Sequence, residues 1–261
     1  MMLALAAACG GASRMVEDGG AGSPVPAARD TIRVLAYNVH HGEGVDEVVD
    51  LERIADLIRS VDPDLVALQE VDSAATRTDG VHQAAELGRL TGLEPVFGAF
   101  MPYQGGAYGM ALLSRWPIAE SRNLRLPAGA EPRTALAVTV ASPTTGRRIR
   151  FVGIHFYRTD DERLAQALRL EEHLSDETIP TLLAGDFNST PDSDVMIHFS
   201  RGWAIVPKGA DHLTFPSYAP DREIDFVLFR PEGRWEVVTR RLLDEPVASD
   251  HRPVVVELVL R

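Results

Sequence analysis

From Thr31 to the C-terminus, short apolar segments rich in β-branched residues alternate with turn signals, and this pattern strongly restricts the fold. The segments with strand character are residues 31–38, 64–71, 94–100, 109–114, 118–124, 134–141, 149–156, 181–185, 224–229, 235–240 and 254–260. Helical spacing occupies residues 50–60 and 82–91, and a third helix is expected to end near residue 173. Along the chain, helices follow some of the early strands, then come strands of hairpin type, and then a helix and more strands. This order predicts two sheets packed together with helices on the outside.

Two helix starts are predicted from local signals. Thr159 and Glu162 have the spacing of a capping box, in which a hydroxyl and a carboxylate satisfy free amides at a helix N-terminus. Thr190 followed by Pro191 is typical of an N-cap and first helical residue, and predicts a short helix there.

Residues 1–30 are predicted to lie outside the folded domain, which we place at residues 31–261. The chain begins MMLALAAA, and its only cysteine, Cys9, follows at once. This stretch resembles the end of a bacterial lipoprotein signal peptide, with Cys9 as the lipidated residue; the alternative is a frayed N-terminus with a chance cysteine. Residues 12–30 have the composition of a flexible tether. We therefore expect export, as a membrane-anchored lipoprotein or a periplasmic or extracellular protein.

The charge balance restricts the partners. With 26 Lys and Arg against 38 Asp and Glu, the formal net charge is −12, which argues against non-specific binding to duplex nucleic acid. We expect no stable nucleic-acid partner and a monomeric protein. No apolar run reaches the roughly 18 residues that a membrane span needs, and a single cysteine cannot form an intramolecular disulfide.

Polar side chains gather where the apolar strands begin or end. They are Asn38, Glu70, His155, Asp186, Asn188, Asp225, Asp250 and His251. Each alone has an ordinary interpretation as a turn residue, a solvated strand end or a core histidine. Buried strands, however, rarely tolerate carboxylates unless these are paired or bind metal. The whole set in this order therefore favours a functional site.

The residue types indicate the chemistry. Carboxylates such as Glu70, Asp186 and Asp250 are hard oxygen ligands that suit Mg²⁺ or Mn²⁺. The absence of a cysteine cluster and of HExxH gives zinc little support. Histidines near carboxylates suit acid–base catalysis, and a metal with imidazolium and amide groups stabilises a phosphoryl transition state. The sequence contains neither a GxxxxGK[ST] phosphate loop nor a GxSxG nucleophile elbow.

The motifs YNVHHG, LQEVD, GIHF, GDFN, REIDFVLF and SDHRPV occur in this order between about Thr31 and Leu260. In this the chain resembles the endonuclease/exonuclease/phosphatase superfamily, which includes DNase I-like nucleases, abasic-site endonucleases, neutral sphingomyelinases and inositol polyphosphate phosphatases. The resemblance implies a DNase I-like four-layer α/β sandwich, with two mixed or antiparallel sheets between helices.

The resemblance also implies roles for individual residues. Asn38 and Glu70 match positions that bind a divalent metal, and Asp250 matches a metal-site acid. Asp186 and Asn188 match residues that orient the attacking water and contact the phosphate. The remaining matches are His155 as a catalytic residue, Asp225 as the support of the C-terminal histidine, and His251 as the group that protonates or stabilises a phosphate oxygen.

Two further residues are weaker candidates for substrate binding. His40 stands where abasic-site nucleases have Asp, which weakens a role in DNA repair. Two interpretations of His40 and His41 are open: they contact the phosphate of a substrate, or they are a loop pair without a functional role. The sequence does not favour one interpretation over the other. Arg133, in EPRTAL, sits where related sequences often place a phosphate-contacting arginine; otherwise it is a surface residue in a turn. Specificity is expected in loops such as residues 77–83 and 101–108.

We therefore expect a secreted or lipid-anchored hydrolase dependent on Mg²⁺, with Mn²⁺ as a possible substitute. Its substrate would be a small or lipid-derived phosphodiester, attacked in line by water. The first alternative is an extracellular nuclease acting on DNA or RNA. The second is a non-catalytic binding protein on the same fold. The sequence leaves open the natural substrate, the preference between phosphodiester and phosphomonoester, and the number of metals.

Overall fold

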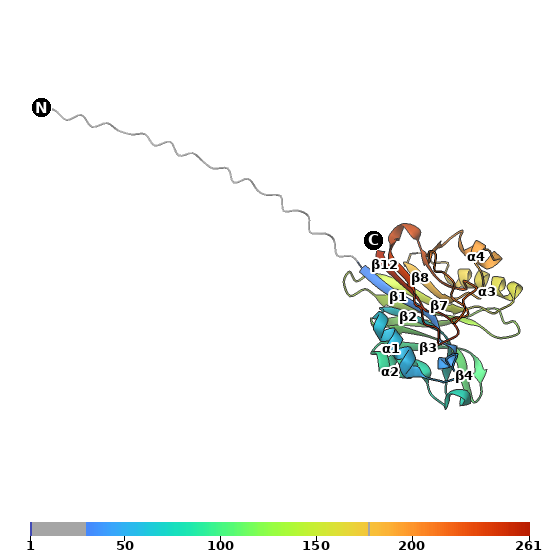
Figure 1. Cartoon of the computed structure of the whole chain (residues 1–261). Helices are drawn as coiled ribbons and strands as arrows, with labels where there is room; N and C mark the ends of the chain where they lie inside the picture. Colours follow the sequence, from blue (N-terminus) through green and yellow to red (C-terminus); the bar gives the residue numbers. More distant parts are fainter. Residues whose placement is uncertain (2–29, 177) are drawn as a thin grey trace.

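The computed structural model describes residue 1, residues 30–176 and residues 178–261 (Figure 1). Twelve strands occupy these residues. They are β1 (Asp30–Asn38), β2 (Leu65–Ser73), β3 (Glu94–Tyr103), β4 (Gly106–Ser114), β5 (Ile118–Arg125), β6 (Thr134–Ala141), β7 (Arg148–His155), β8 (Thr181–Asp186), β9 (Ala204–Ile205), β10 (Asp225–Arg230), β11 (Trp235–Leu242) and β12 (Val254–Leu260). The two-residue strand β9 is the one that the apolar pattern did not predict.

The strands form two six-stranded sheets, ordered β11-β12-β1-β2-β4-β3 and β5-β6-β7-β8-β10-β9. Parallel pairing is confined to β1 with β2 in the first sheet and β7 with β8 in the second, and the remaining neighbours are antiparallel. Both sheets are therefore mixed, as expected for a DNase I-like sandwich.

The helices cover the outer faces of the two sheets. They are α1 (Leu51–Val61), α2 (Gln83–Thr91), α3 (Asp160–His173) and α4 (Asp194–Phe199), with 3-10 turns at His40–Gly42, Thr76–Thr78 and Glu232–Arg234. Figure 1 shows α1 and α2 together on one side of the molecule and α3 and α4 on the other. The predicted arrangement of two sheets between helices is confirmed.

Side-chain alternation along the strands divides the core into three clusters. On β1, Val34 and Ala36 belong to the central cluster between the sheets, whereas Leu35 and Tyr37 pack with α1 and α2. The outer face of the second sheet packs against α3 and α4 through a third cluster that includes Phe187. Because successive side chains of a strand point to opposite faces, each apolar strand serves two layers at once.

Helix α3 begins and ends where the sequence predicted, but the capping box predicted at its start does not form. Thr159 is the N-cap residue, but its side chain makes no capping hydrogen bond to the backbone. Its hydroxyl donates instead to Glu162 Oε2 at 2.6 Å, and Glu162 Oε1 accepts from the backbone N–H of Ala130 at 2.7 Å. Glu162 therefore contacts the backbone of a loop that is distant in sequence, and not the N-terminal amide of its own helix as the local pattern predicted.

The predicted start of the next helix is wrong by a few residues. Helix α4 begins at Asp194, and Ser193 is its N-cap, with the hydroxyl accepting from the backbone N–H of Met196 at 3.3 Å. The hydroxyl of Thr190 donates to Asp192 at 2.6 Å in the turn that precedes the helix. Two capping signals lie close together here, and the second one is used.

The topology gathers the carboxyl ends of the parallel strands at one edge of the sandwich. In the first sheet Asn38 at the end of β1 pairs with Gln69, and in the second His155 at the end of β7 pairs with Asp186. The Asn38 side-chain amide donates a hydrogen bond to Asp186, so the end of β1 contacts the end of β8 across the two sheets. Carboxyl ends of parallel strands are a common place for ligand sites in α/β proteins.

The predictions for the N-terminal segment are not tested by the structure. Residues 2–29, which include Cys9 and the expected tether, lie outside the described residues. Lipid attachment, export and the boundary at residue 30 therefore stay predictions. Within the described part of the chain, no helix combines the length and apolar character needed to cross a membrane.

Candidate active site

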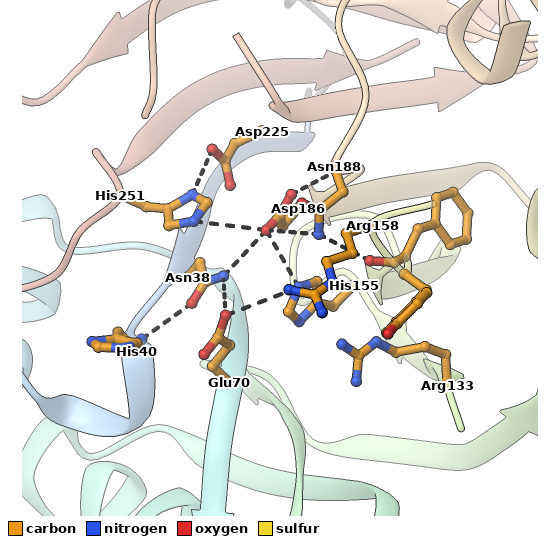
Figure 2. Close-up of polar contacts among 12 residues, drawn as sticks. Asn38, His40, Glu70, Arg133, His155, Arg158, Asp186, Asn188, Asp225 and His251 are labelled. Atoms are coloured by element: carbon orange, nitrogen blue, oxygen red, sulfur yellow. Dashed lines mark hydrogen bonds and ion pairs between the residues drawn. The ribbon is translucent and has the colours of Figure 1, made fainter. Parts of the chain in front are cut away.

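Four of the predicted site residues meet where β1, β2, β7 and β8 approach one another (Figure 2). Asn38, His155 and Asp186 each end their strand and are at most 3% exposed. Glu70 lies within β2 and is half-buried. The site therefore combines two side chains from each sheet, and its geometry depends on how the sheets pack.

Glu70 reaches the site through a β-bulge. The register of β2 against β4 shifts between Gln69 and Val71, and Glu70 has a left-handed backbone with φ of 59°. A bulge of this kind turns the extra side chain away from the regular alternation. The Glu70 carboxylate thereby lies 3.0 Å from Asn38 Nδ2 and 4.0 Å from His155 Nε2.

The Asn38 side-chain amide links the two acidic residues. Its Nδ2 donates to Glu70 Oε1 at 3.0 Å and to Asp186 Oδ2 at 3.2 Å, so one buried amide bridges the sheets. Its Oδ1 accepts from the backbone N–H of His40 at 3.1 Å. Because a buried amide needs hydrogen-bond partners, this network fixes its orientation.

Gly185 allows the close approach of β8 to β7 just before Asp186. Its backbone has φ of 145°, and a Cβ there would lie 2.1 Å from the carbonyl oxygen of Ile154. A larger residue would push β8 away from β7 and displace the carboxylate. The glycine of the GDFN motif is thus required by the strand that positions Asp186.

His251 and Asp225 form a buried pair beside Asp186. The imidazole Nδ1 lies 3.0 Å from Asp225 Oδ2, and both residues are at most 4% exposed. Burial alone would lower the pKa of His251, but the charges of Asp225, Asp186 and Asp250 and the hydrogen bond to Asp225 raise it to about 10. His251 is therefore a cation at neutral pH, with Nε2 3.8 Å from Asp186 Oδ2.

Asp186 lies between two histidines that differ in charge. Burial, followed by the neighbouring Asp225 charge, raises the pKa of Asp186 to about 7, although His251 and hydrogen bonds from Asn188 and Asn38 oppose this rise. His155 Nε2 lies 3.4 Å away, and burial, then the Arg133 charge, holds the pKa of His155 well below its ordinary value. A carboxyl whose pKa lies near the working pH is suited to proton transfer.

Asn188 follows Asp186 in a left-handed turn with φ of 49°. Its backbone N–H donates to Asp186 Oδ1 at 2.7 Å, and its side-chain Nδ2 donates to the carbonyl oxygen of Phe156 at 2.9 Å. The residue also lines the cleft that opens from the site. The structure therefore places Asn188 at the wall of this cleft.

Asp250 and His40 lie at the border of this network. The Asp250 carboxylate accepts from the hydroxyl of Ser249 at 3.4 Å, and its charge contributes to the raised pKa of His251. His40 contacts Asn38 through its backbone. Two groups with the spacing of metal ligands occur in the described residues, namely His40, His41 and Glu70, and Asp186, Asp225 and His251. Asp250 belongs to neither group.

A cleft of about 350 Å³ opens directly from Glu70, His155 and Asn188. Its other walls are formed by Arg77, Met101, Tyr103, Tyr108, Glu131, Arg133, Tyr157 and Arg158. Arg133 is 6% exposed, pairs with Glu131, and lies 4.9 Å from the ring of Phe100. It is thus a buried cleft residue and not the surface turn residue that the sequence left as an alternative.

Several cleft residues were not singled out from the sequence. Arg77 is paired with the buried Asp72 at 2.7 Å and lies over the rings of Tyr103 and Tyr108, at 4.6 and 5.4 Å from their centroids. Arg77 begins the segment 77–83 and both tyrosines lie in the segment 101–108, the two segments in which specificity was expected. The second of these is mostly strand and not loop, since Tyr103 ends β3 and Tyr108 lies in β4. Tyr157 and Arg158 directly follow the GIHF motif, and that adjacency was the signal available for them.

The oxygen donors suit a hard divalent cation. Glu70 contributes a carboxylate that faces the cleft, and Asn38 Oδ1 retains a second lone pair beside its bond from His40. Carboxylate and amide oxygens together with water are the ligands that Mg²⁺ and Mn²⁺ prefer. The residues present therefore fit such an ion.

The chain is similar to known proteins in sequence and in fold. The chain is 31% identical over 247 residues to the uncharacterized protein YbhP of Escherichia coli K12, covering 88% of this chain and 97% of that protein. It is 29% identical over 211 residues to human Nocturnin, covering 67% of this chain and 47% of Nocturnin. An endonuclease/exonuclease/phosphatase structure from Beutenbergia cavernae superimposes with a TM-score of 0.72 at 25% identity, covering 88% of this chain and 72% of that chain.

Residues 35–251 match the sequence profile described as the Endonuclease/Exonuclease/phosphatase family. This range runs from β1 to His251 and contains the residues that meet at the strand ends. Members of the family generally hydrolyse phosphoester bonds and typically depend on a divalent metal. The chain thus belongs to the endonuclease/exonuclease/phosphatase family, a superfamily of phosphoesterases and nucleases.

Proposed function

We propose that this protein is a Mg²⁺-dependent phosphoric ester hydrolase that acts on a small or lipid-derived phosphodiester. The observation that supports it best is the contact of Asp186 with the Asn38 amide at 3.2 Å, beside a His251 whose charge Asp225 stabilises. This arrangement provides a base, a cation and oxygen ligands beside one cleft. A non-catalytic protein would have no need to bury these ionisable groups together.

Asp186 is the residue best placed to orient and deprotonate an attacking water. Its carboxylate is fixed by the Asn188 backbone N–H at 2.7 Å and by the Asn38 amide at 3.2 Å. The pKa of about 7 leaves a substantial fraction ionised at neutral pH and still able to take a proton. The water is therefore expected to bind between Asp186 and the phosphorus atom.

His251 supplies positive charge where the phosphoryl group gains negative charge. It is held by Asp225 at 3.0 Å, so its imidazolium is oriented before the substrate arrives. Groups fixed in advance stabilise a transition state without reorganising during the reaction. His155 is neutral and lies on the cleft side of Asp186, where it can hydrogen-bond to a substrate oxygen.

A divalent cation, when held by Glu70 and Asn38, would polarise a phosphoryl oxygen and stabilise the charge of the transition state. These two residues would hold the ion on the first sheet, opposite the proposed base Asp186 on the second sheet. The Asn38 amide keeps the Glu70 and Asp186 carboxylates at 3.0 and 3.2 Å from a single nitrogen.

The cleft favours a compact anionic substrate. Arg77, Arg133 and Arg158 line it, and the guanidinium groups of the first two lie against aromatic rings. Arginine suits phosphate because its planar fork offers several donors. Arg133 is paired with Glu131, and Arg77 is paired with Asp72. Arg158 forms no ion pair within the described part of the structure, so its charge is available to a substrate.

Arg158→Gln is expected to raise KM roughly tenfold while kcat changes little, because one charged hydrogen bond to the substrate is lost in ground state and transition state alike. Arg158 is exposed, so the fold should tolerate this change. The matched control is Arg169→Gln, on the exposed surface of α3 beside Glu172. Steady-state kinetics on the best substrate provides the measurement. A fall in kcat at unchanged KM would contradict the assignment.

The proposed function is tested with the full chain on a substrate panel. The panel holds bis-p-nitrophenyl phosphate, sphingomyelin, inositol phosphates, plasmid DNA and RNA, each with Mg²⁺ or with EDTA. We expect hydrolysis of a small or lipid phosphodiester that EDTA abolishes. Preferential cleavage of DNA or RNA with steep salt dependence would replace the proposal by the nuclease alternative. Folded protein without activity on any phosphate ester would support the binding-protein alternative.

A further inference from the structure

The loop after β1 holds two consecutive histidines in a strained conformation. His40, His41 and Gly42 all have left-handed backbones, with φ of 45, 47 and 79°. The left-handed region is unfavourable for residues that carry a Cβ, so surrounding contacts must maintain it. They include the Gln83 side chain, which donates to the His41 carbonyl at 2.6 Å, and the N–H of Asp50, which donates to the Gly42 carbonyl at 2.9 Å.

Glu43 orients one nitrogen of each imidazole ring. His40 Nδ1 lies 3.2 Å from the Glu43 backbone carbonyl oxygen, so this nitrogen carries the proton and donates. His41 Nε2 lies 3.4 Å from the Glu43 carboxylate. A histidine that binds metal usually directs its other ring nitrogen at a carbonyl or carboxylate in this way.

The other nitrogen of each ring remains available. His41 is only 6% exposed, and its Nδ1 is buried without a hydrogen-bond partner. No hydrogen bond to His40 Nε2 occurs within the described residues. A buried ring nitrogen without a partner is unfavourable unless it meets a ligand. One ligand atom each from His40, His41 and Glu70 lie within 4.8 Å of one another.

We infer that His40, His41 and Glu70 form a binding site for a divalent transition-metal ion such as Zn²⁺ or Mn²⁺. Imidazole nitrogen binds these ions in preference to Mg²⁺, which prefers oxygen ligands. Figure 2 shows His40 and Glu70 both beside Asn38, at the border of the active site. Glu70 would be shared, with one side of its carboxylate toward the two histidines and the other toward the ion held with Asn38.

This site goes beyond the proposed function, which requires a single cation bound by oxygen. It gives the protein a second metal position at the rim of the active site and explains why two adjacent histidines are held in left-handed conformations. It also assigns Glu43 as a positioning residue, because Glu43 contacts both rings and belongs to neither group of ligands.

The test uses the full chain freed of metal with EDTA and then dialysed. Zn²⁺ binding is measured by isothermal titration calorimetry in excess Mg²⁺, and pulsed electron paramagnetic resonance of bound Mn²⁺ detects coupling to imidazole nitrogen. We expect Zn²⁺ binding that Mg²⁺ does not displace, and nitrogen coupling in the Mn²⁺ signal. His40→Ala and His41→Ala should each weaken Zn²⁺ binding more than about tenfold, and Glu43→Gln about tenfold.

His173→Ala, an exposed histidine on α3, is the matched control and should leave Zn²⁺ affinity unchanged. Since His41 is buried, circular dichroism must show that its variant folds; the half-buried His40 permits a second variant, His40→Gln. Absence of nitrogen coupling in the wild-type protein would overturn the inference. So would coupling that survives loss of both histidines but disappears in His251→Ala, because the metal would then lie in the Asp186 group.

These outcomes are separate from the test of the proposed function. Hydrolysis with Mg²⁺ in a protein that binds no Zn²⁺ would overturn the histidine site alone. Zn²⁺ binding with nitrogen coupling, in a protein inactive on every phosphate ester, would overturn the proposed function alone.

Discussion

Asp186→Asn is expected to lower kcat for phosphodiester hydrolysis by about 10²–10⁴-fold, the usual contribution of a general base. The substitution keeps the size of the side chain and leaves Glu70, Asn38 and His251 in place. An amide has one oxygen, so it can accept from either the Asn188 backbone N–H or the Asn38 amide, but it cannot take a proton from water. The loss should therefore appear in kcat, with little change in KM.

The same variant is expected to unfold at a higher temperature than the wild type at pH 8 in EDTA. Burial raises the folded-state pKa of Asp186 to about 7, above the value of 3.8 for the free side chain. An acid with a raised folded pKa binds its proton more tightly when folded, so its ionisation opposes folding as pH rises from about 4 to 7. The stability difference between variant and wild type should grow over this range and stay constant above it.

Calorimetric unfolding from pH 4 to 8 measures the stability effect, and steady-state kinetics with Mg²⁺ measures the catalytic one. Asp194→Asn, at the exposed N-terminus of α4, is the matched control and should retain full activity. An Asp186→Asn protein that keeps more than a tenth of wild-type kcat would exclude Asp186 as the base. A melting temperature that falls at pH 8 would show that its carboxylate stabilises the fold.

His251→Ala is expected to reduce kcat by about 10²–10³-fold, corresponding to ~3–4 kcal/mol of transition-state stabilisation. The variant loses the imidazolium beside Asp186. It also leaves the Asp225 carboxylate, which is 1% exposed, without its partner at 3.0 Å. Removing one member of a buried ion pair typically destabilises a protein by about 3–5 kcal/mol.

A second substitution separates these two effects. His251→Ala with Asp225→Asn removes the unpaired charge, so most of the lost stability should return while kcat stays low. Urea unfolding and kinetics on both variants provide the comparison. Recovery of activity in the double variant would mean that His251 serves the fold and not the reaction. Activity close to wild type in the single variant would remove His251 from the proposed mechanism altogether.

The parts of the fold that depend on local pattern could be predicted from the sequence. Apolar runs ending in a polar residue marked Asn38, His155 and Asp186, and the structure gathers all three at one edge. Their convergence follows from parallel pairing of β1 with β2 and of β7 with β8. The sequence alone did not fix the strand order.

Features that depend on contacts between distant segments could not be predicted. The orientation of Glu70 results from a bulge opposite β4, and the predicted capping box of α3 is replaced by a contact of Glu162 with the backbone of Ala130. Arg77 joins the cleft because Asp72 and Tyr103, which are far apart in sequence, both contact it. The pairing of the His40 and His41 rings with Glu43 likewise depends on left-handed backbone that no spacing rule predicts.

The position of β12 has a consequence for biosynthesis. This last strand lies between β11 and β1 in the first sheet, and His251 stands just before it. During translation, β1 emerges before β12 and lacks this neighbour until β12 has left the ribosome. The amide of Asn38 and the imidazole of His251 therefore come together only after this part of the chain has been made, so a chain truncated before His251 has the cleft-lining arginines but an incomplete candidate active site.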